Sequence, residues 1–429
     1  MPNVAPHQNT AGGTDTPGLD DSGVDSFSAS YEDYKEADVL MILGTDPYET
    51  KTVAFTQWIA PVGATIIQVD PRKTFTASYA EANGGLHLQV NPGTDAWAIM
   101  AIARLILEEG WQDADFVRDY ATQTRDEIEA DSGWRRRAFG RTWDEFQAEI
   151  LTEDEYTLGR ASDITGVPAD KLRRVAELLA ARRNGERPKS SLLYEKGLYW
   201  THNYENTAAL GNLSVLIGAR GKPERATSRM GGHQRGGASG APYPFDKSPT
   251  EYRDPSGEVH KLEMDTDRWH VQGRTRMVWS FGNDWVNGSG ASHHLVSRLR
   301  EMTRETEPQV SSAVPATAVD QLKQRLDAGG MFIVQSDIYP NDRTEFADLV
   351  LPAATRGEEE FVRNNAERRM RLYGKIMDPP GEAIPDWKAV SLVAQKMGFD
   401  GFDWADSNEV FEEPGPRSGG RKDYKKLVE

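Results

Sequence analysis

Residues 39–47 read VLMILGTDP, an uninterrupted apolar run that stops at a glycine and an acidic residue. A second apolar run, ATIIQV at 64–69, is followed by the similar ending DPR at 70–72. The stretch between the two runs, 49–60, is long enough to form a crossover helix. Parallel strands are covered by helices on both faces, so their sequences read as continuous apolar runs. These residues therefore predict the first βαβ unit of a buried parallel sheet.

The same alternation continues through the first half of the chain. A third apolar run at 86–90 is followed by NPGTD, and apolar residues then recur at helical spacing over 96–110. Helix start and stop signals and apolar spacing predict further elements, namely a helix at 168–181, a strand at 190–193 and a helix at 205–217.

The second half repeats this organisation without repeating the sequence. Its strand-like runs are 276–281, 331–334 and 349–351, and each is followed by small or acidic residues. We therefore predict an α/β fold with two doubly wound, Rossmann-like units whose sheets are mostly parallel. The expected segments are an extended N-terminal stretch at 1–30, a first dinucleotide-binding unit at 31–225, an irregular Gly/Pro-rich active-site segment at 226–275, a second dinucleotide-binding unit at 276–412 and a polar tail at 413–429.

Composition narrows the classes of function. The 429 residues carry 50 basic and 67 acidic side chains, a net charge of −17, which disfavours nucleic-acid and anionic-membrane partners. No apolar run approaches the length of a membrane span, and residues 1–30 lack the pattern of a signal peptide. There are no cysteines, which excludes disulfides, thiolate zinc sites and cysteine-ligated iron–sulfur clusters within this sequence.

Four loops at predicted strand ends carry the first functional signal: 44–47, 69–72, 91–95 and 282–284. Glycines there let backbone approach a pyrophosphate, and acidic side chains can accept hydrogen bonds from a ribose or a purine amino group. Each loop alone is weak, because Asp in a turn often serves as a cap. No GxGxxG motif follows the first strand, which argues against an ordinary nicotinamide dehydrogenase.

The sharpest segment is RMGGHQ at 229–234. Arg229 offers a planar donor fork and His233 can donate or relay a proton, so this loop could surround a small oxyanion, although such loops are often plain surface structure. YEKG at 194–197 could form a simple ion pair. We predict no metal-ligating side chains, since adjacent residues such as His293 and His294 cannot easily share one ion.

Taken in order, seven segments carry a resemblance to a known family: GTDPYET, VDPR, NPGTD, YEKG, RMGGHQ, FADLVLPAA and NNAERRMRLY. They are similar to the large subunit of the arsenite oxidases, within the dimethyl-sulfoxide-reductase family of molybdenum oxidoreductases. VDPR and NPGTD mark the wider family, whereas YEKG and RMGGHQ followed by APYPFDK resemble the arsenite oxidases more narrowly. The resemblance covers roughly residues 30–415.

The resemblance implies molybdenum held by two molybdopterin guanine dinucleotides, one across each unit. It places Arg229 and His233 at the substrate pocket. The residues that it places at the cofactor are Gly44, Asp46, Pro47, Asp70, Arg72, Gly93, Asp95, Glu195, Lys196, Gly197, Gly232, Gln234, Gly282, Asn283, Asp337, Asn365 and Arg368.

The implied reaction is oxidation of arsenite to arsenate by oxygen-atom transfer, with Arg229 binding more strongly as negative charge develops. Such a hydrogen bond is worth roughly 1.5–3 kcal/mol. The implied partners are a small Rieske-type iron–sulfur subunit and a cytochrome or similar acceptor, in the periplasm or elsewhere outside the cytoplasmic membrane, with export alongside the partner subunit.

The resemblance also leads us to expect a fragment. Family members carry an N-terminal domain with an iron–sulfur cluster and a C-terminal barrel, and neither is found in this sequence. Two alternatives stay open. One is a sibling molybdenum enzyme acting on formate, nitrate or another oxyanion, and the other is a cofactor-free binding or scaffold protein with this fold.

Overall fold

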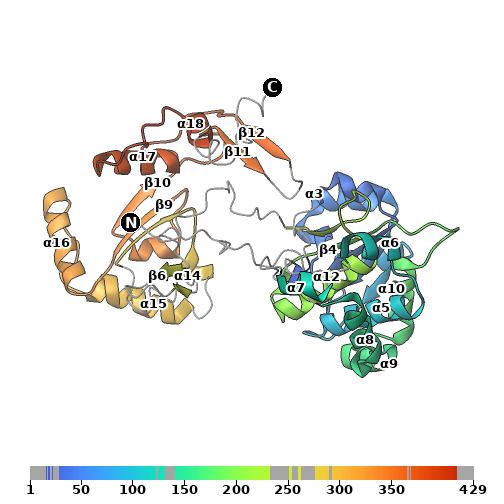
Figure 1. Ribbon diagram of the computed structural model, residues 1–429. Coiled ribbons are helices and arrows are strands. Elements are labelled where there is room, and N and C mark those ends of the chain that lie inside the picture. The colour runs from blue at the N-terminus through green and yellow to red at the C-terminus, as the bar shows by residue number, and fades with distance from the viewer. Residues whose placement is uncertain are drawn as a thin grey trace. The chain divides into compact units, whose positions relative to one another are not determined.

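A computed structural model describes residues 16, 18–19, 22, 29–121, 124–130, 141–231, 251–253, 259–261, 276–288, 292–364, 367 and 369–412. The chain forms two compact units, which Figure 1 colours from blue to green and from yellow to red. The first unit takes Gly12–Arg235 with Asn364–Arg369, and the second takes the remainder.

The first unit is built on a five-stranded sheet in the order β3-β2-β1-β4-β5, with every neighbouring pair parallel. The strands are β1 (Val39–Leu43), β2 (Thr65–Val69), β3 (Leu86–Leu88), β4 (Ser190–Tyr194) and β5 (Thr227–Arg229). The strand order reverses between β1 and β4. Ligands of doubly wound sheets bind at such a switch point, beyond the carboxyl ends of the strands. The sheet order therefore directs attention to the loops that follow β1 and β4.

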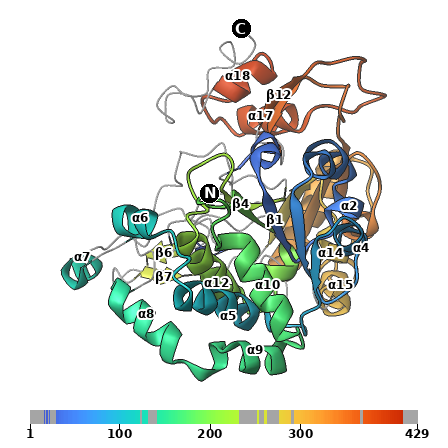
Figure 2. The same cartoon turned by 90° about the vertical axis from the view of Figure 1, so that its right-hand side faces the viewer.

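Helices cover both faces of this sheet, as the sequence pattern predicts. All residues of β1 are buried; the odd-numbered positions join a core with helices α5 (Asp95–Glu108), α10 (Ala169–Ala180) and α12 (Asn203–Leu216). The even-numbered positions join a second core on the opposite face, which includes α4 (Phe75–Ala82). Figure 2 shows α4 and α5 on opposite sides of β1. Side chains alternate across a strand, so one apolar run serves both cores.

The crossover between β1 and β2 is helical, as expected, but it is broken into short pieces. These are α2 (Pro47–Thr50), α3 (Thr52–Ala54), the π-helix η2 (Phe55–Ile59) and the 3₁₀-helix η3 (Ala60–Val62). Other short elements of the unit are η1 (Glu32–Glu36), α6 (Ala114–Phe116), the π-helix η4 (Val117–Ala121), α7 (Arg125–Ala130), α8 (Trp143–Thr152), η5 (Asp154–Tyr156), α9 (Leu158–Thr165) and α11 (Lys196–Tyr199). Pro47 occupies the first turn of α2, where its missing N–H is harmless.

The second unit holds a three-stranded parallel sheet in the order β10-β9-β8. Its strands are β8 (Met277–Phe281), β9 (Phe332–Asp337) and β10 (Leu349–Pro352). Two small pairs of strands accompany it, β6 (Glu251–Arg253) with β7 (Val259–Lys261) and β11 (Phe361–Asn364) with β12 (Met370–Tyr373). Its helices are α14 (Trp285–Gly288), α15 (Ser292–Arg300), η7 (Glu301–Glu305), α16 (Pro315–Asp327), η8 (Asp342–Phe346), α17 (Asp386–Lys396) and α18 (Ser407–Glu412).

The predicted α/β class with parallel sheets is confirmed, and one local expectation differs. The sequence predicts an irregular segment at 226–275, whereas the structure has three strands there: β6 pairs with β7, and Thr227–Arg229 form β5, which pairs with β4. β5 is short and polar, so no apolar run in the sequence predicts it, although all three of its residues are buried. Among the described helices, none combines the length and apolar character needed to cross a bilayer.

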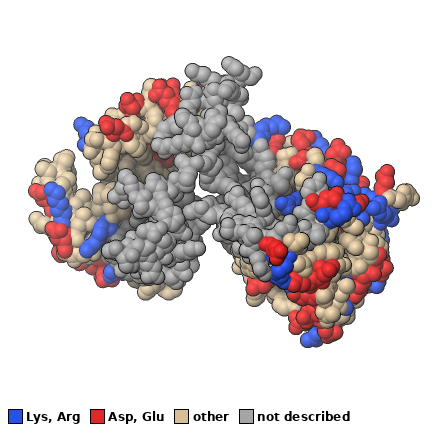
Figure 3. Space-filling view, viewed as in Figure 1, with Lys and Arg blue, Asp and Glu red and all other residues tan. Residues whose placement is uncertain are grey.

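The described surface of the first unit carries both signs of charge. Figure 3 shows acidic and basic side chains interspersed over it. Some lie close enough to pair, such as Arg118 Nη1 with Asp115 Oδ1 at 2.8 Å. Exposed pairs of this kind contribute little to stability. The buried charges at the end of β4 are of a different kind, and they belong to the candidate site.

Candidate functional site

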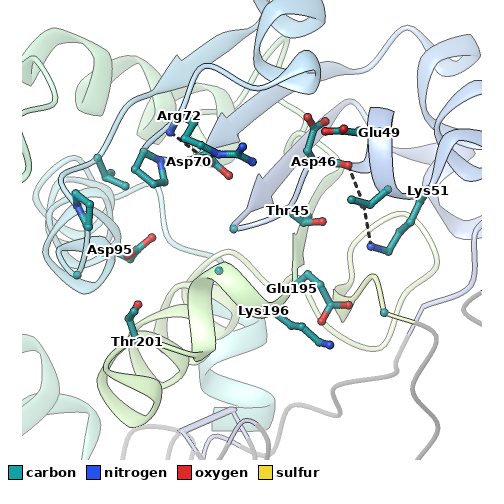
Figure 4. Close-up of a pocket in the computed structure, with 18 residues that line it drawn as sticks. Thr45, Asp46, Glu49, Lys51, Asp70, Arg72, Asp95, Glu195, Lys196 and Thr201 are labelled. Carbon is teal, nitrogen blue, oxygen red and sulfur yellow. Dashed lines mark hydrogen bonds and ion pairs between the residues drawn. The ribbon is translucent and has the colours of Figure 1, made fainter. Parts of the chain in front are cut away.

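A cavity of about 610 Å³ opens at the carboxyl edge of the first unit's sheet, within the size range of small-molecule sites. It lies at the switch point, where the loops after β1, β2, β3 and β4 converge. Figure 4 shows these loops and their polar side chains around the cavity. The lining residues are Gly44, Thr45, Asp46, Glu49, Thr50, Lys51, Asp70, Pro71, Arg72, Val90, Pro92, Gly93, Asp95, Glu195, Lys196, Gly197, Thr201 and Gly231.

Two glycines bring backbone from β1 and β4 into direct contact at this switch point. Gly44 has φ +60°, and a Cβ there would lie 2.3 Å from the Leu198 nitrogen. A Cβ on Gly197 would lie 2.7 Å from the Gly44 Cα, and Gly197 N donates to Gly44 O at 2.9 Å. Only glycine fits both positions without a backbone shift. The cavity wall here is bare backbone, which a flat ligand can approach closely.

Asp46 lines the cavity, but its carboxylate is already committed within the protein. Its two oxygens accept hydrogen bonds from Phe75 N at 3.0 Å, Thr76 N at 3.1 Å and Thr76 Oγ1 at 2.6 Å. These groups belong to the first turn of α4, whose backbone donors otherwise lack partners. Asp46 therefore ties the loop after β1 to the helix after β2, which is a structural role that the sequence left open.

Asp70 and Asp95 form an acidic part of the wall. Burial raises the pKa of Asp70, with opposing contributions from the Arg72 N–H, which Asp70 Oδ1 accepts at 2.9 Å, and from the Arg72 charge. Burial, and secondarily the charge of Asp70, raise the pKa of Asp95 to about 6. Two poorly solvated carboxyls aimed at one cavity are suited to accept hydrogen bonds from ligand N–H or O–H groups.

Glu195 and Arg229 form a buried ion pair behind the cavity. Arg229 Nε donates to Glu195 Oε1 at 2.9 Å, and the side chains are only 2% and 8% exposed. The Tyr199 hydroxyl donates to the same oxygen at 2.9 Å and accepts from Arg229 Nη2. The guanidinium also lies 4.7 Å from the centre of the Tyr199 ring. Two donors, Arg229 Nε and the Tyr199 hydroxyl, thus hold one carboxylate oxygen in place.

The other carboxylate oxygen, Glu195 Oε2, is buried and has no hydrogen-bond partner among the residues that the structure describes. It lies beside Gly231, where an added Cβ would come within 2.0 Å of it. Both residues line the cavity. An orphaned buried acceptor of this kind calls for an explanation, and a donor on a bound ligand would supply one.

Arg229 itself does not line the cavity. The sequence suggested a loop guanidinium facing an oxyanion, whereas the structure makes Arg229 the last residue of β5, bound to Glu195 and Tyr199. Its predicted role at the substrate stays a prediction. His233, Gly232, Gln234, Asn365 and Arg368 lie outside the described residues.

The other predicted cofactor residues fall into two groups. Those that line the cavity are Gly44, Asp46, Asp70, Arg72, Gly93, Asp95, Glu195, Lys196 and Gly197, whereas Pro47 starts α2 beside it. Gly282, Asn283 and Asp337 follow or end strands of the second unit's own sheet. Asp337 accepts from Ile338 N at 2.8 Å and from Asn341 Nδ2 at 2.9 Å.

Sequence reasoning missed several residues that line the cavity, chiefly Glu49, Thr50, Lys51 and Thr201. The first three follow the loop at 44–47 within one helical turn, so their position was available as a signal. Thr201 follows α11, a short helix that the sequence pattern did not predict.

Comparison of the sequence with known proteins identifies the family that the chain resembles. The model of the molybdopterin oxidoreductase family matches residues 3–396. The chain is 41% identical to the iodate reductase subunit IdrA of Denitromonas iodatirespirans over 96% of the chain and 47% of that protein. It is 29% identical to the arsenite oxidase subunit AioA of Herminiimonas arsenicoxydans over 98% of the chain and 51% of that protein.

The fold agrees with this match. The structure of acetylene hydratase from Pelobacter acetylenicus superposes with a TM-score of 0.63 at 16% identity, over 96% of this chain and 53% of that one. The chain thus spans about half the length of the relatives that it matches. The resemblance to arsenite oxidases holds at the level of the family, and the iodate reductase subunit is more similar than the arsenite oxidase subunit. The family match over 3–396 and the 41% identity establish that this chain belongs to the molybdopterin oxidoreductases.

Proposed function

We propose that this chain is the cofactor-holding part of the catalytic subunit of a molybdenum oxidoreductase, and that its substrate is iodate or a similar small oxyanion. The observation that carries the proposal is the cavity at the switch point, walled by bare backbone on one side and by Lys51 and Lys196 on another. The 41% identity to an iodate reductase subunit supports iodate in particular.

The residues of the cavity fit the molybdenum–pterin group that the family implies. The backbone wall at Gly44 and Gly197 suits a flat ring system, and Glu195 Oε2 is a buried acceptor for a ring N–H. Asp70 and Asp95 suit the hydroxyl and amino groups of a nucleotide, so we propose the guanine dinucleotide form. When bound, this group supplies two-electron exchange of an oxygen atom.

The protein's own contribution is binding, charge and protons. Reduction of an oxyanion releases each oxygen as water and consumes two electrons and two protons. Because the substrate is an anion, positive charge at the site helps to bind it. Lys51 and Lys196 supply positive charge at the cavity. A second protein must deliver the electrons, and both relatives are named as subunits of an enzyme. We propose a small iron–sulfur subunit as that partner, a cytochrome-like protein beyond it, and a location outside the cytoplasmic membrane.

Arsenite oxidation is the second candidate. The YEKG and RMGGHQ segments support it, together with 29% identity to an arsenite oxidase subunit. The two candidates differ in charge, because iodate is an anion and arsenious acid is neutral at pH 7. They also differ in direction, since iodate accepts electrons and arsenite donates them.

The test is a steady-state assay of the native holoenzyme with its partner subunits. Iodate and nitrate would be offered with a reduced dye, and arsenite and formate with an oxidised dye. We expect dye oxidation that depends on iodate. Turnover of arsenite alone would favour the second candidate, and turnover of nitrate or formate alone would favour a sibling enzyme. A chain without molybdenum and without turnover would favour the scaffold alternative.

A further inference from the structure

Lys51 is a half-buried cation at the cavity, and neither the sequence motifs nor the family match assign it a role. It follows α2, in the crossover from β1 to β2, and its side chain reaches the wall near Glu195 and Lys196 (Figure 4). Within the described part of the chain, its Nζ donates a single weak hydrogen bond, to Thr50 Oγ1 at 3.4 Å. Among the described residues, no carboxylate lies within ion-pairing distance of it.

The two neighbouring cations, Lys196 and Arg229, each contact another side chain. Lys196 Nζ lies 4.8 Å from the centre of the exposed Trp200 ring, and Arg229 is paired with Glu195. The group of Lys51, Lys196, Arg229 and Glu195 therefore contains three cations and one carboxylate, whose negative charge Arg229 already neutralises at close range. This part of the cavity carries excess positive charge.

The acidic residues nearby do not cancel this excess. The carboxylates of Asp46 and Glu49 also line the cavity, but neither is among the charged groups that shift the pKa of Lys51. Burial lowers the pKa of Lys51; the charges of Lys196 and Arg229 act in the same direction, and that of Glu195 opposes them. A desolvated ammonium without a counter-ion gains much from a bound anion, because its interaction is little screened by water.

We propose that the Lys51 ammonium binds an oxyanion in this cavity. The same chemistry has two possible sources, a phosphate of the dinucleotide cofactor and the oxyanion substrate. The assignment to substrate rests on the proposed function, whereas the assignment to a cofactor phosphate does not need iodate to be the substrate. If substrate is the source, Lys51 also favours charged oxyanions over neutral ones such as arsenious acid.

The experiment compares the wild-type holoenzyme with its Lys51→Gln and Lys51→Arg variants and with a matched control variant, Lys73→Gln. Lys73 is exposed and paired with Glu81 at 2.8 Å, so its loss changes the net charge equally without touching the cavity. Binding of iodate and of inorganic phosphate to the oxidised enzyme is measured by calorimetry without an electron donor. Molybdenum and guanine nucleotide per chain are measured on the same samples.

We expect Lys51→Gln to lower either the affinity for iodate or the content of molybdenum and guanine nucleotide. Lys51→Arg should restore most of the lost quantity, and Lys73→Gln should leave both quantities unchanged. Weakening of iodate binding by roughly tenfold to a hundredfold at constant cofactor content would identify the substrate as the anion. A comparable loss of nucleotide and molybdenum, with iodate binding unchanged in the loaded fraction, would identify a cofactor phosphate.

The proposal is overturned if Lys51→Gln changes neither readout, or if Lys51→Arg fails as badly as Lys51→Gln. The outcomes also separate this inference from the proposed function. Wild-type turnover of iodate with an unaffected Lys51→Gln variant defeats only the inference. Absence of iodate turnover with a Lys51-dependent loss of phosphate binding or of nucleotide defeats only the proposed substrate.

Discussion

Arg229 Nε donates to Glu195 Oε1 at 2.9 Å, and both residues sit at the carboxyl ends of adjacent strands in the first unit. The pairing follows from strand register, because Arg229 lies opposite Tyr194 in the β4–β5 ladder and Glu195 is the next residue. Each charge is buried and depends on the other for compensation. The pair thereby fixes a carboxylate whose other oxygen lies beside Gly231 in the wall of the cavity.

Replacing Arg229 by Ala should therefore damage the fold of the site before it affects substrate. The change leaves Glu195 buried without its cation, which typically costs about 3–5 kcal/mol. We expect a lower free energy of unfolding and loss of molybdenum together with turnover, and a milder effect of Arg229→Lys. Denaturant titration and metal analysis check this. A variant that keeps full stability and molybdenum yet loses turnover would instead support contact between Arg229 and substrate.

The contact between Gly44 and Gly197 gives a second prediction. Gly197→Ala places a Cβ 2.7 Å from the Gly44 Cα, so backbone must move, at a cost of about 1–3 kcal/mol. The control is Gly159→Ala in α9, where a Cβ meets nothing within 4 Å and alanine should stabilise by about 0.5–1 kcal/mol. Thermal unfolding and molybdenum content are the readouts. Equal behaviour of the two variants would contradict the backbone wall.

Asp46 provides a prediction that separates structure from binding. Asp46→Ala removes three hydrogen bonds from the first turn of α4 and should lower the free energy of unfolding by about 1–3 kcal/mol. The effect should appear even in protein stripped of cofactor, and Asp46→Asn should retain part of the stability. If stripped Asp46→Ala protein were as stable as wild type while the holoenzyme lost nucleotide, Asp46 would act as a ligand instead.

Asp95 predicts a pH dependence of stability. Its pKa is about 6 in the folded chain against an ordinary 3.8, so the folded state holds the proton more tightly. The free energy of unfolding must therefore fall as pH rises between these values, by up to about 3 kcal/mol. Asp95→Asn cannot ionise and should be more stable than wild type at neutral pH, with an advantage that shrinks by roughly 1 kcal/mol at pH 5. Urea titrations across this range measure the difference; an advantage independent of pH would refute this cause.

Much of the fold could be predicted from the sequence because its central strands are continuous apolar runs. β1, β2, β4, β8 and β9 all lie where such runs were found. β5 could not be predicted, since three polar residues gain their place only by pairing with β4. The broken crossover after β1 was also invisible, because helical spacing does not distinguish one helix from several short ones.

The site was predictable in part for the same reason. Strand-end loops converge at a switch point in any doubly wound sheet, so Gly44, Asp70 and Asp95 could be brought together from sequence alone. The partnership of Glu195 with Arg229 required strand register, which no local pattern encodes. The position of Lys51 required the local course of the chain after α2, so its place in the cavity wall emerged only from the structure.

The most direct test of the central claim is the molybdenum content of the native subunit, measured together with turnover of iodate. We expect one molybdenum per chain and oxidation of an electron donor that depends on iodate. Native protein that contains no molybdenum and consumes no iodate would contradict the account.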